Sequence, residues 1–159
     1  MPLPHRHLFN FFLGKGLHLA RASVRDDATS CPPKDLTPEA CHVLFDEGTE
    51  YPGSSPLNAE KRPGTYVCAA CHTPLFSSQT KYESGSGWPS FWQALPGAVA
   101  TKTDHTLAVA RIEYHCAHCG GHQGHVFEDG PRPTGQRYCN NGVALRFIPD
   151  GEPLPARHG

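Results

Sequence analysis

The sequence has no long apolar run and no excess of charge of either sign. No stretch reaches the roughly 20 apolar residues that a membrane-spanning helix needs. Lys and Arg number 14 against 15 Asp and Glu, so the formal net charge is -1, and the clustered positive charge typical of nucleic-acid binding is missing. We therefore expect a soluble protein without a membrane or nucleic-acid partner. Nothing in the sequence demands an oligomer, so we expect a monomer.

Core-forming residues are also scarce. Hydrophobic residues make up 38% of the 159 residues, while Gly and Pro number 16 each. This composition predicts short strands and many turns, held together by a covalent or metal staple rather than by a large core. The length suits one domain with short extensions.

Residues 1–34 form a basic N-terminal extension and linker. No acidic residue precedes Asp26, and apolar residues recur near one helical face, which is typical of an organelle transit peptide. A disordered basic tail is the equal alternative, and a secretory signal is less favoured. The first interpretation predicts a mitochondrial or other organellar location, and the second a cytoplasmic one. Cys31, followed by two prolines, belongs to the linker.

The predicted folded domain spans residues 35–150, and residues 151–159 are expected to form a loose tail. Thr37-Pro38-Glu39 supplies an N-cap, a proline at the first helical position and an early acid, so a short helix should run to Glu47 and end at Gly48. Short β-branched or aromatic runs predict strands at 65–68, 106–114, 124–127 and 143–148. The fold class is therefore mainly β and antiparallel, with small helices.

Four cysteines form two CxxC pairs, Cys68 with Cys71 and Cys116 with Cys119. Each pair places two sulfurs on one tight turn, and two such turns complete the tetrahedral shell of a structural Zn²⁺. Two disulfides would imply an oxidising compartment, and a redox CxxC would need a βαβ setting that is missing here. Zinc is the favoured interpretation, although neighbouring histidines, His72, His115 and His118, could replace a cysteine ligand.

Cys139 is left as a lone thiol once these four cysteines hold a metal. Arg137 precedes it by two residues, and His122 and His125 lie upstream. Positive charge and imidazoles lower a thiol pKa, and the thiolate is the nucleophile. Without such neighbours, a lone cysteine is most often an inert buried one.

Two aromatic residues, Trp88 and Phe91, lie in a Gly- and Pro-containing turn. Their faces suit a methyl or thioether group beside a bent backbone. Taken alone, this pattern is more typical of core packing.

The order of motifs resembles the methionine-R-sulfoxide reductase B family over about Leu36 to Pro149. The matching motifs are CxxC, Ser-Gly-x-Gly-Trp-Pro-Ser-Phe, a second CxxC, and Gly-His-x-Gly-His-Val-Phe-x-Asp-Gly-Pro followed by Arg-Tyr-Cys-x-Asn. The resemblance implies two antiparallel sheets with peripheral helices and a structural zinc. It also implies reduction of the R epimer of methionine sulfoxide, free or in proteins, with thioredoxin or another thiol as reductant.

The resemblance also implies roles for individual residues. Cys139 matches the nucleophile, which would become a sulfenic acid. Trp88 and Phe127 would bind the substrate, with Trp88 on its methyl group. The remaining matches would hold and protonate the sulfoxide oxygen or complete the polar side of the pocket: His122, His125, Asn141 and Arg137.

One departure from the family concerns the regeneration of Cys139. Many members carry a resolving cysteine where this chain has Ser86, and serine forms no disulfide. Direct reduction by an external thiol is the favoured hypothesis, followed by Cys31 and then Cys41 as resolving cysteine. The alternative to an enzyme is a zinc-stapled, non-catalytic binding module of the same fold.

Overall fold

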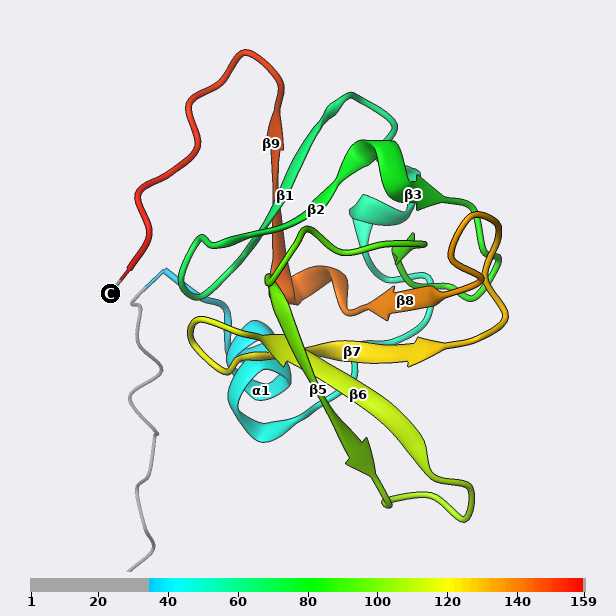
Figure 1. Ribbon diagram of the computed structural model, residues 1–159. Helices are drawn as coiled ribbons and strands as arrows, with labels where there is room; N and C mark the ends of the chain where they lie inside the picture. Colours follow the sequence, from blue (N-terminus) through cyan, green and yellow to red (C-terminus); the bar gives the residue numbers. More distant parts are fainter. Residues whose placement is uncertain (1–34, 159) are drawn as a thin grey trace, which may run out of the picture. The chain divides into compact units, whose positions relative to one another are not determined.

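The computed structural model describes residues 35–158, so Cys31 and the predicted N-terminal extension lie outside the described residues. The described chain forms two antiparallel sheets (Figure 1). The three-stranded sheet has the order β2 (Pro74–Ser77), β1 (Gly64–Cys68), β9 (Leu145–Pro149). The six-stranded sheet has the order β3 (Lys81–Tyr82), β4 (Ser90–Phe91), β8 (Arg137–Asn140), β7 (His122–Phe127), β6 (Arg111–Cys116), β5 (Val99–Asp104). The predicted mainly β fold class is confirmed.

The helices are short. They are α1 (Pro38–Asp46) and the 3₁₀ turns η1 (Pro56–Ala59), η2 (Ser78–Thr80) and η3 (Gly142–Ala144). The Thr37 side chain accepts a hydrogen bond from the Ala40 N–H at 3.1 Å, which confirms the predicted N-cap of α1. The helix ends through Glu47, which adopts a left-handed conformation with φ 55°. Gly48 follows and packs against the His42 ring, where a Cβ would lie 2.3 Å from the ring carbon. Within residues 35–158, no helix is long and apolar enough to cross a membrane.

The strand predicted over 106–114 is wrong in its first half. Residues 105–110 form the turn of the β5–β6 hairpin, and the strand begins at Arg111. The Asp104 carboxylate accepts hydrogen bonds from the Thr106 N–H and hydroxyl, and such a local side-chain contact competes with strand pairing. Leu107 and Val109 are 56% and 77% exposed, so these two apolar residues do not mark a buried strand.

Aromatic side chains from both sheets meet in the core. Tyr66 on β1 and Phe76 on β2 pack against Phe91 on β4, with ring centroids 4.9 and 4.2 Å apart. Tyr114 and Tyr138 extend this cluster, with ring centroids 5.1 Å apart. Burying an aromatic ring of this size contributes about 1.5–3 kcal/mol. Phe91 therefore belongs to the core, as its sequence context taken alone suggested.

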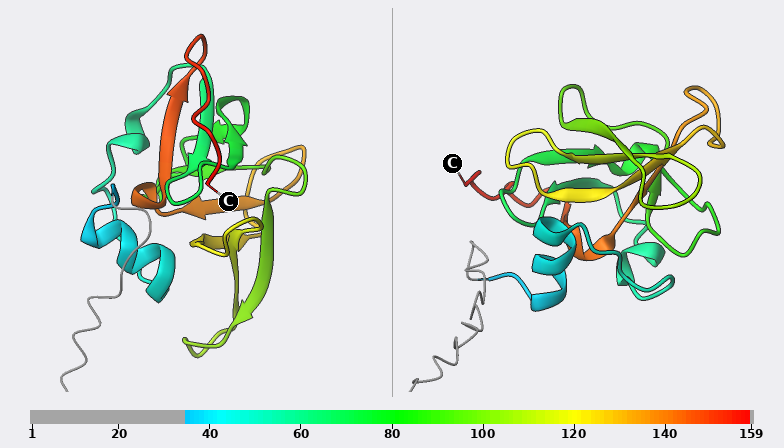
Figure 2. Two further views of the ribbon diagram at one scale, coloured as in Figure 1. Left: turned by 90° about the vertical axis from the view of Figure 1, so that its left-hand side faces the viewer. Right: turned by 90° about the horizontal axis from the view of Figure 1, so that it is seen from below.

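The segment after β9 runs back along the domain (Figures 1 and 2), and His158 near its end lines the same pocket as Asp35 and Thr37, which precede α1. The His158 N–H donates to the Cys71 carbonyl at 2.9 Å, and the His158 carbonyl lies 3.0 Å from His118 Nε2. His72 Nδ1 lies 3.1 Å from the Ala156 carbonyl. The expectation of a loose tail did not anticipate these contacts with both CxxC turns.

Glu50 connects the loop after α1 to the segment between β8 and β9. Its buried carboxylate accepts hydrogen bonds from the Gly142 N–H and, at 3.2 Å, from the Val143 N–H. Its backbone N–H donates to Asn141 Oδ1 at 3.0 Å, and its carbonyl accepts from Trp88 Nε1 at 3.2 Å. Burial raises the pKa of Glu50. This residue therefore fixes several segments at once.

Replacing Glu50 by Ala should lower the free energy of unfolding by about 3 kcal/mol, because two buried N–H groups lose their acceptor. Urea denaturation at constant metal content measures this. Glu83→Ala is the matched control, since Glu83 forms only an exposed ion pair with Lys61, and such pairs contribute little. Equal stability of the two variants would contradict the role assigned to Glu50.

Candidate active site and metal centre

Strand register places Cys139 beside His125. Cys139 on β8 lies opposite Ser90 on β4 and, on its other side, opposite His125 on β7. The row continues from His125 to Glu113 on β6 and from there to Lys102 on β5. Directly opposite residues share one face of a sheet, with Cβ atoms about 5 Å apart. The backbone ladder alone therefore brings a thiol and an imidazole together.

A β-bulge on β7 sets which side chains reach this face. Tyr114 lies opposite Gly124 and His115 opposite His122, so Gln123 is the extra residue. The Gln123 side chain points into the interior, where its Nε2 lies 3.5 Å from Cys68 Sγ and its Oε1 accepts from Asn140 Nδ2 at 3.1 Å. A bulge re-aims side chains locally, and here it directs one of them away from the pocket.

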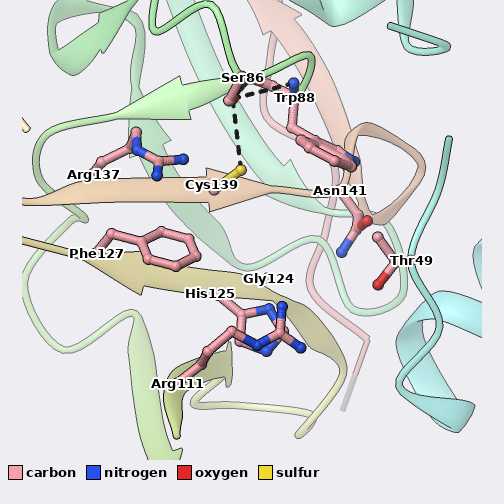
Figure 3. A pocket seen from close by; sticks show the side chains of 10 residues that line it. All are labelled: Thr49, Ser86, Trp88, Arg111, Gly124, His125, Phe127, Arg137, Cys139 and Asn141. Carbon is pink, nitrogen blue, oxygen red and sulfur yellow. Dashed lines mark hydrogen bonds between the residues drawn. The ribbon is translucent and has the colours of Figure 1, made fainter. Parts of the chain in front are cut away.

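A pocket of about 310 Å³ opens over Cys139 (Figure 3). Six residues singled out from the sequence line it: Trp88, His125, Phe127, Arg137, Cys139 and Asn141. Ser86, at the position discussed for a resolving cysteine, also lines it. Three further lining residues were not identified as site residues from the sequence: Thr49, Arg111 and Gly124.

Gly124 is required by the close approach of β7 and β8. A Cβ on this residue would lie 1.9 Å from the Cys139 carbonyl oxygen. Any side chain would therefore push the two strands apart and displace the thiol from His125. The Gly-His-x-Gly-His pattern contained this signal, since a glycine inside a strand often marks a close backbone approach.

The Cys139 thiol is partly buried, and Ser86 Oγ lies 3.7 Å from its Sγ (Figure 3). Burial raises the pKa of Cys139, and the hydrogen bond from Ser86 and the charge of Arg137 oppose this without cancelling it. The sequence-based expectation of a lowered pKa is therefore wrong for the free protein, because desolvation of the thiolate outweighs the nearby cation.

Arg137 and Phe127 form one wall of the pocket. Arg137 makes a two-pronged ion pair with Asp129, at 2.8 Å from Nε to Oδ1 and 3.0 Å from Nη2 to Oδ2. Its guanidinium carbon lies 4.3 Å from the centroid of the Phe127 ring. Such paired and stacked geometry fixes an arginine more tightly than a single contact.

Trp88 and Asn141 occupy the other side of the pocket. The Trp88 indole N–H is used by the Glu50 carbonyl, so its ring face is what remains for a ligand. Asn141 Nδ2 donates to the Gln123 carbonyl at 2.9 Å, and its Oδ1 accepts from Glu50. Both side chains are therefore held by backbone groups.

The two histidines differ in position. His125 lines the pocket, and its Nε2 lies 2.8 Å from Asp104 Oδ2. His122 is 3% exposed, does not line the pocket, and lies with its ring centroid 5.6 Å from that of His125. Burial lowers the pKa of His122 to about 4, so its ring is neutral at neutral pH. The sequence alone could not separate these two residues.

The two CxxC turns converge. The Sγ atoms of Cys68 and Cys119 are 3.7 Å apart and those of Cys71 and Cys116 are 3.5 Å apart, with all four within 4.8 Å of one another. All four are free thiols. Tetrahedral coordination with Zn–S bonds of about 2.3 Å requires sulfurs about 3.8 Å apart. The two distances given are close to this value, so the cluster could hold a metal ion.

The two turns share a backbone geometry. The residue after each pair is left-handed, His72 with φ 63° and Gly120 with φ 78°. Its N–H donates to the carbonyl of the first cysteine, at 2.8 Å for Cys68 and 2.9 Å for Cys116. The Gly121 N–H also lies 3.4 Å from Cys119 Sγ. An N–H group directed at a sulfur atom stabilises the thiolate form that a metal ligand needs.

Of the two candidate resolving cysteines, the structure describes Cys41. Cys41 lies on α1 and does not line the pocket, and Cys31 is outside the described residues. Among the pocket-lining residues, Cys139 is the one cysteine.

These features define a mainly β domain in which four cysteines converge and a fifth lies in a separate pocket. The SelR domain family matches residues 36–149, and the chain belongs to this family. Three similar relatives are each called peptide methionine sulfoxide reductase MsrB. The relative from Leptospira interrogans is 54% identical over 115 residues, covering 72% of this chain and 88% of the relative. Those from Methanosarcina barkeri and Agrobacterium fabrum are 53% and 50% identical, covering 75% and 73% of this chain and 84% and 87% of the relatives.

The raised pKa of Cys139 predicts slow alkylation at neutral pH. The rate of iodoacetamide modification of the Cys139 peptide, followed by mass spectrometry, should reach half its maximum above pH 8.5, the ordinary thiol value. Arg137→Gln should move this midpoint further up, because a nearby cation stabilises the thiolate. Arg157→Gln, in the exposed C-terminal segment, is the control. A wild-type midpoint below pH 8 would contradict the dominance of burial.

Proposed function

We propose that this protein reduces the R epimer of methionine sulfoxide to methionine, using Cys139 as nucleophile and a thiol as reductant. Membership of the family and the names of its relatives support this activity. The single observation that carries it is the pocket in which Cys139 lies directly across the strand pair from His125, with Trp88 beside it. No specific observation favours a non-catalytic binding module.

The reaction transfers one oxygen atom and two electrons. The Cys139 thiol gives up its proton and its sulfur attacks the substrate sulfur, so that negative charge develops on the sulfoxide oxygen. A proton delivered to that oxygen allows the sulfur–oxygen bond to break. The resulting hydroxyl passes to the Cys139 sulfur as the bond between the two sulfurs breaks, so methionine leaves and Cys139 becomes a sulfenic acid.

The pocket separates apolar from polar contacts. The faces of Trp88 and Phe127 suit the methyl group and methylene chain of the substrate. His125 supplies the proton to the sulfoxide oxygen, while Asn141 and Arg137 complete the polar side. His122 is neutral and does not line the pocket, so it packs against the His125 ring and does not contact the substrate.

The raised pKa of Cys139 assigns His125 a second task. In the free protein the thiol is protonated at neutral pH, so it needs a base when substrate arrives. His125 can take this proton and then give it to the departing oxygen, which makes one imidazole serve both steps. The proton balance within the pocket then closes without exchange with solvent.

The four-cysteine cluster would hold Zn²⁺ as a structural ion. When bound, the ion supplies a tetrahedral cross-link between the two CxxC turns and no open coordination position for chemistry. The residues that would hold it are Cys68, Cys71, Cys116 and Cys119. Gln123 links this cluster to Asn140, the neighbour of Cys139. The staple thus supports the strand that carries the nucleophile.

Regeneration proceeds by direct attack of an external thiol on the sulfenic acid. A first thiol forms a mixed disulfide and releases water, and a second thiol restores Cys139. Thioredoxin or a small thiol can fill this role. Ser86 beside Cys139 cannot, and Cys41 does not line the pocket. Cys31 remains the second candidate.

The purified protein should consume the R epimer of methionine sulfoxide and leave the S epimer, with dithiothreitol as reductant. Chiral chromatography of both epimers measures this. Cys139→Ser should lose turnover at least about 1,000-fold while keeping its metal, since no other thiol lines the pocket. Ser54→Ala, at an exposed position that does not line the pocket, is the matched control and should retain activity. Loss of the S epimer, or an active Cys139→Ser variant, would overturn the proposal.

Deleting residues 151–159 should speed the release of zinc to a chromogenic chelator by about tenfold. The deletion removes the contacts of His158 and Ala156 with the two CxxC turns. Tenfold corresponds to about 1.4 kcal/mol, which is roughly the net contribution of one hydrogen bond. His158→Ala retains the backbone contacts and should release zinc close to the full-length rate. Identical rates for the deletion and the full chain would show that the segment does not protect the cluster.

A further inference from the structure

His125 is held by a carboxylate from outside the family motif that contains it. Asp104, the last residue of β5, places Oδ2 2.8 Å from His125 Nε2. Both side chains are largely buried, with 9% and 12% of their side-chain surface exposed. Asp104 therefore reaches the pocket histidine from the far side of β6.

Asp104 is itself fixed by three donors. The Thr106 N–H donates to Oδ1 at 2.9 Å, and the Thr106 hydroxyl donates to the same oxygen. Arg111 Nη2 donates to Oδ2 at 3.0 Å. The Thr106 hydroxyl and N–H, followed by His125, hold the pKa of Asp104 well below its ordinary range. The carboxylate consequently stays ionised throughout the working pH range.

An ionised carboxylate can only accept a hydrogen bond, so His125 Nε2 must carry the proton of this contact. The neutral ring then has its lone pair on Nδ1, and the protonated ring has its second N–H there. Fixing the tautomer in this way leaves Nδ1 as the nitrogen that exchanges a proton with the reacting atoms. It also stabilises the imidazolium that forms when the thiol is deprotonated.

A metal ion is the competing explanation, because the ligand atoms of Asp104, Glu113 and His125 lie within 4.8 Å of one another. Each carboxylate already has a cationic partner, however. Arg111 lies 3.0 Å from Asp104 and Lys102 lies 2.9 Å from Glu113. These partners already neutralise both carboxylates, so little negative charge is left for a divalent ion, whereas an imidazole needs only the one acceptor that Asp104 provides.

We propose that Asp104 is the positioning residue of His125, and that Thr106 and Arg111 hold Asp104 for this purpose. The proposal rests on the function proposed above and adds a residue to it. Asp104 does not line the pocket and contacts neither substrate nor Cys139. Its effect reaches the reaction through the orientation, tautomer and charge of His125.

Other charged and titratable groups surround the same ring. They are Arg111 and Glu113 on β6, His122 on β7, and Arg137 and Cys139 on β8. Within the described residues, the hydrogen bond to the His125 ring comes from Asp104 and from none of these groups. Replacing Asp104 therefore removes a specific contact and not merely one charge of many.

Asp104→Asn tests the proposal. The amide can donate a hydrogen bond to Nε2, which would favour the opposite tautomer. The single-turnover rate of methionine formation at saturating R sulfoxide should fall about 100-fold, the lower range of what a positioned acid contributes, while the substrate concentration for half-maximal rate changes less than threefold. The ¹⁵N chemical shifts of the His125 ring should change from those of the tautomer protonated at Nε2 towards those of the tautomer protonated at Nδ1. Asp150→Asn, at an exposed turn, is the matched control.

Thr106→Val is the second variant, because it keeps the carboxylate and removes one of its donors. It should lower the single-turnover rate in the same direction by about tenfold, and it serves if Asp104→Asn fails to fold. Rates within twofold of wild type for either folded variant, or unchanged His125 ring shifts in Asp104→Asn, would overturn the positioning role. The ring shifts are measured without substrate, so a protein inactive on both sulfoxide epimers would refute the proposed function while this test still reports on Asp104.

Discussion

The pairing of β7 with β8 is the constraint on which the site depends. Cys139 faces the pocket because it lies opposite His125, and a slip of one residue would turn the thiol to the other face of the sheet. Gly124 permits the close approach that this register needs. The bulge at Gln123 then separates side chains of β7 that point to the pocket from one that points to the interior. A reactive group is thus placed by backbone geometry before any side-chain contact is made.

The four-cysteine cluster and the pocket are two ends of one buried polar network. Gln123 contacts Cys68 at one end and Asn140 at the other, and Tyr114 donates from its hydroxyl to Asn140 at 2.7 Å. Buried polar groups are expensive unless they are hydrogen-bonded, and a satisfied network fixes one arrangement of its members. The strands β7 and β8 therefore carry both the buried hydrogen-bond network and the pocket residues His125 and Cys139.

The sequence predicted the parts of the site that lie in local motifs. The two CxxC turns, Trp88 and Cys139 were identified from spacing and resemblance, because each depends on residues close in the chain. Asp104 was not identified, since its role requires the β5–β6 hairpin to fold it back onto β7. The raised pKa of Cys139 was also missed, because burial depends on the whole fold while Arg137 is visible two residues away. The strand of β5 is polar and half exposed, and it carried no periodic apolar signal.

The central claim is that Cys139 alone accepts the sulfoxide oxygen and that no second pocket thiol resolves it. One measurement tests this most directly: mixing reduced protein with excess R-methionine sulfoxide and no reductant, then counting methionine released and labelling the protein with dimedone. We expect one methionine per protein and a dimedone adduct on the Cys139 peptide. Methionine formation without modification of Cys139, or a disulfide joining Cys139 to another cysteine in place of the adduct, would contradict the account.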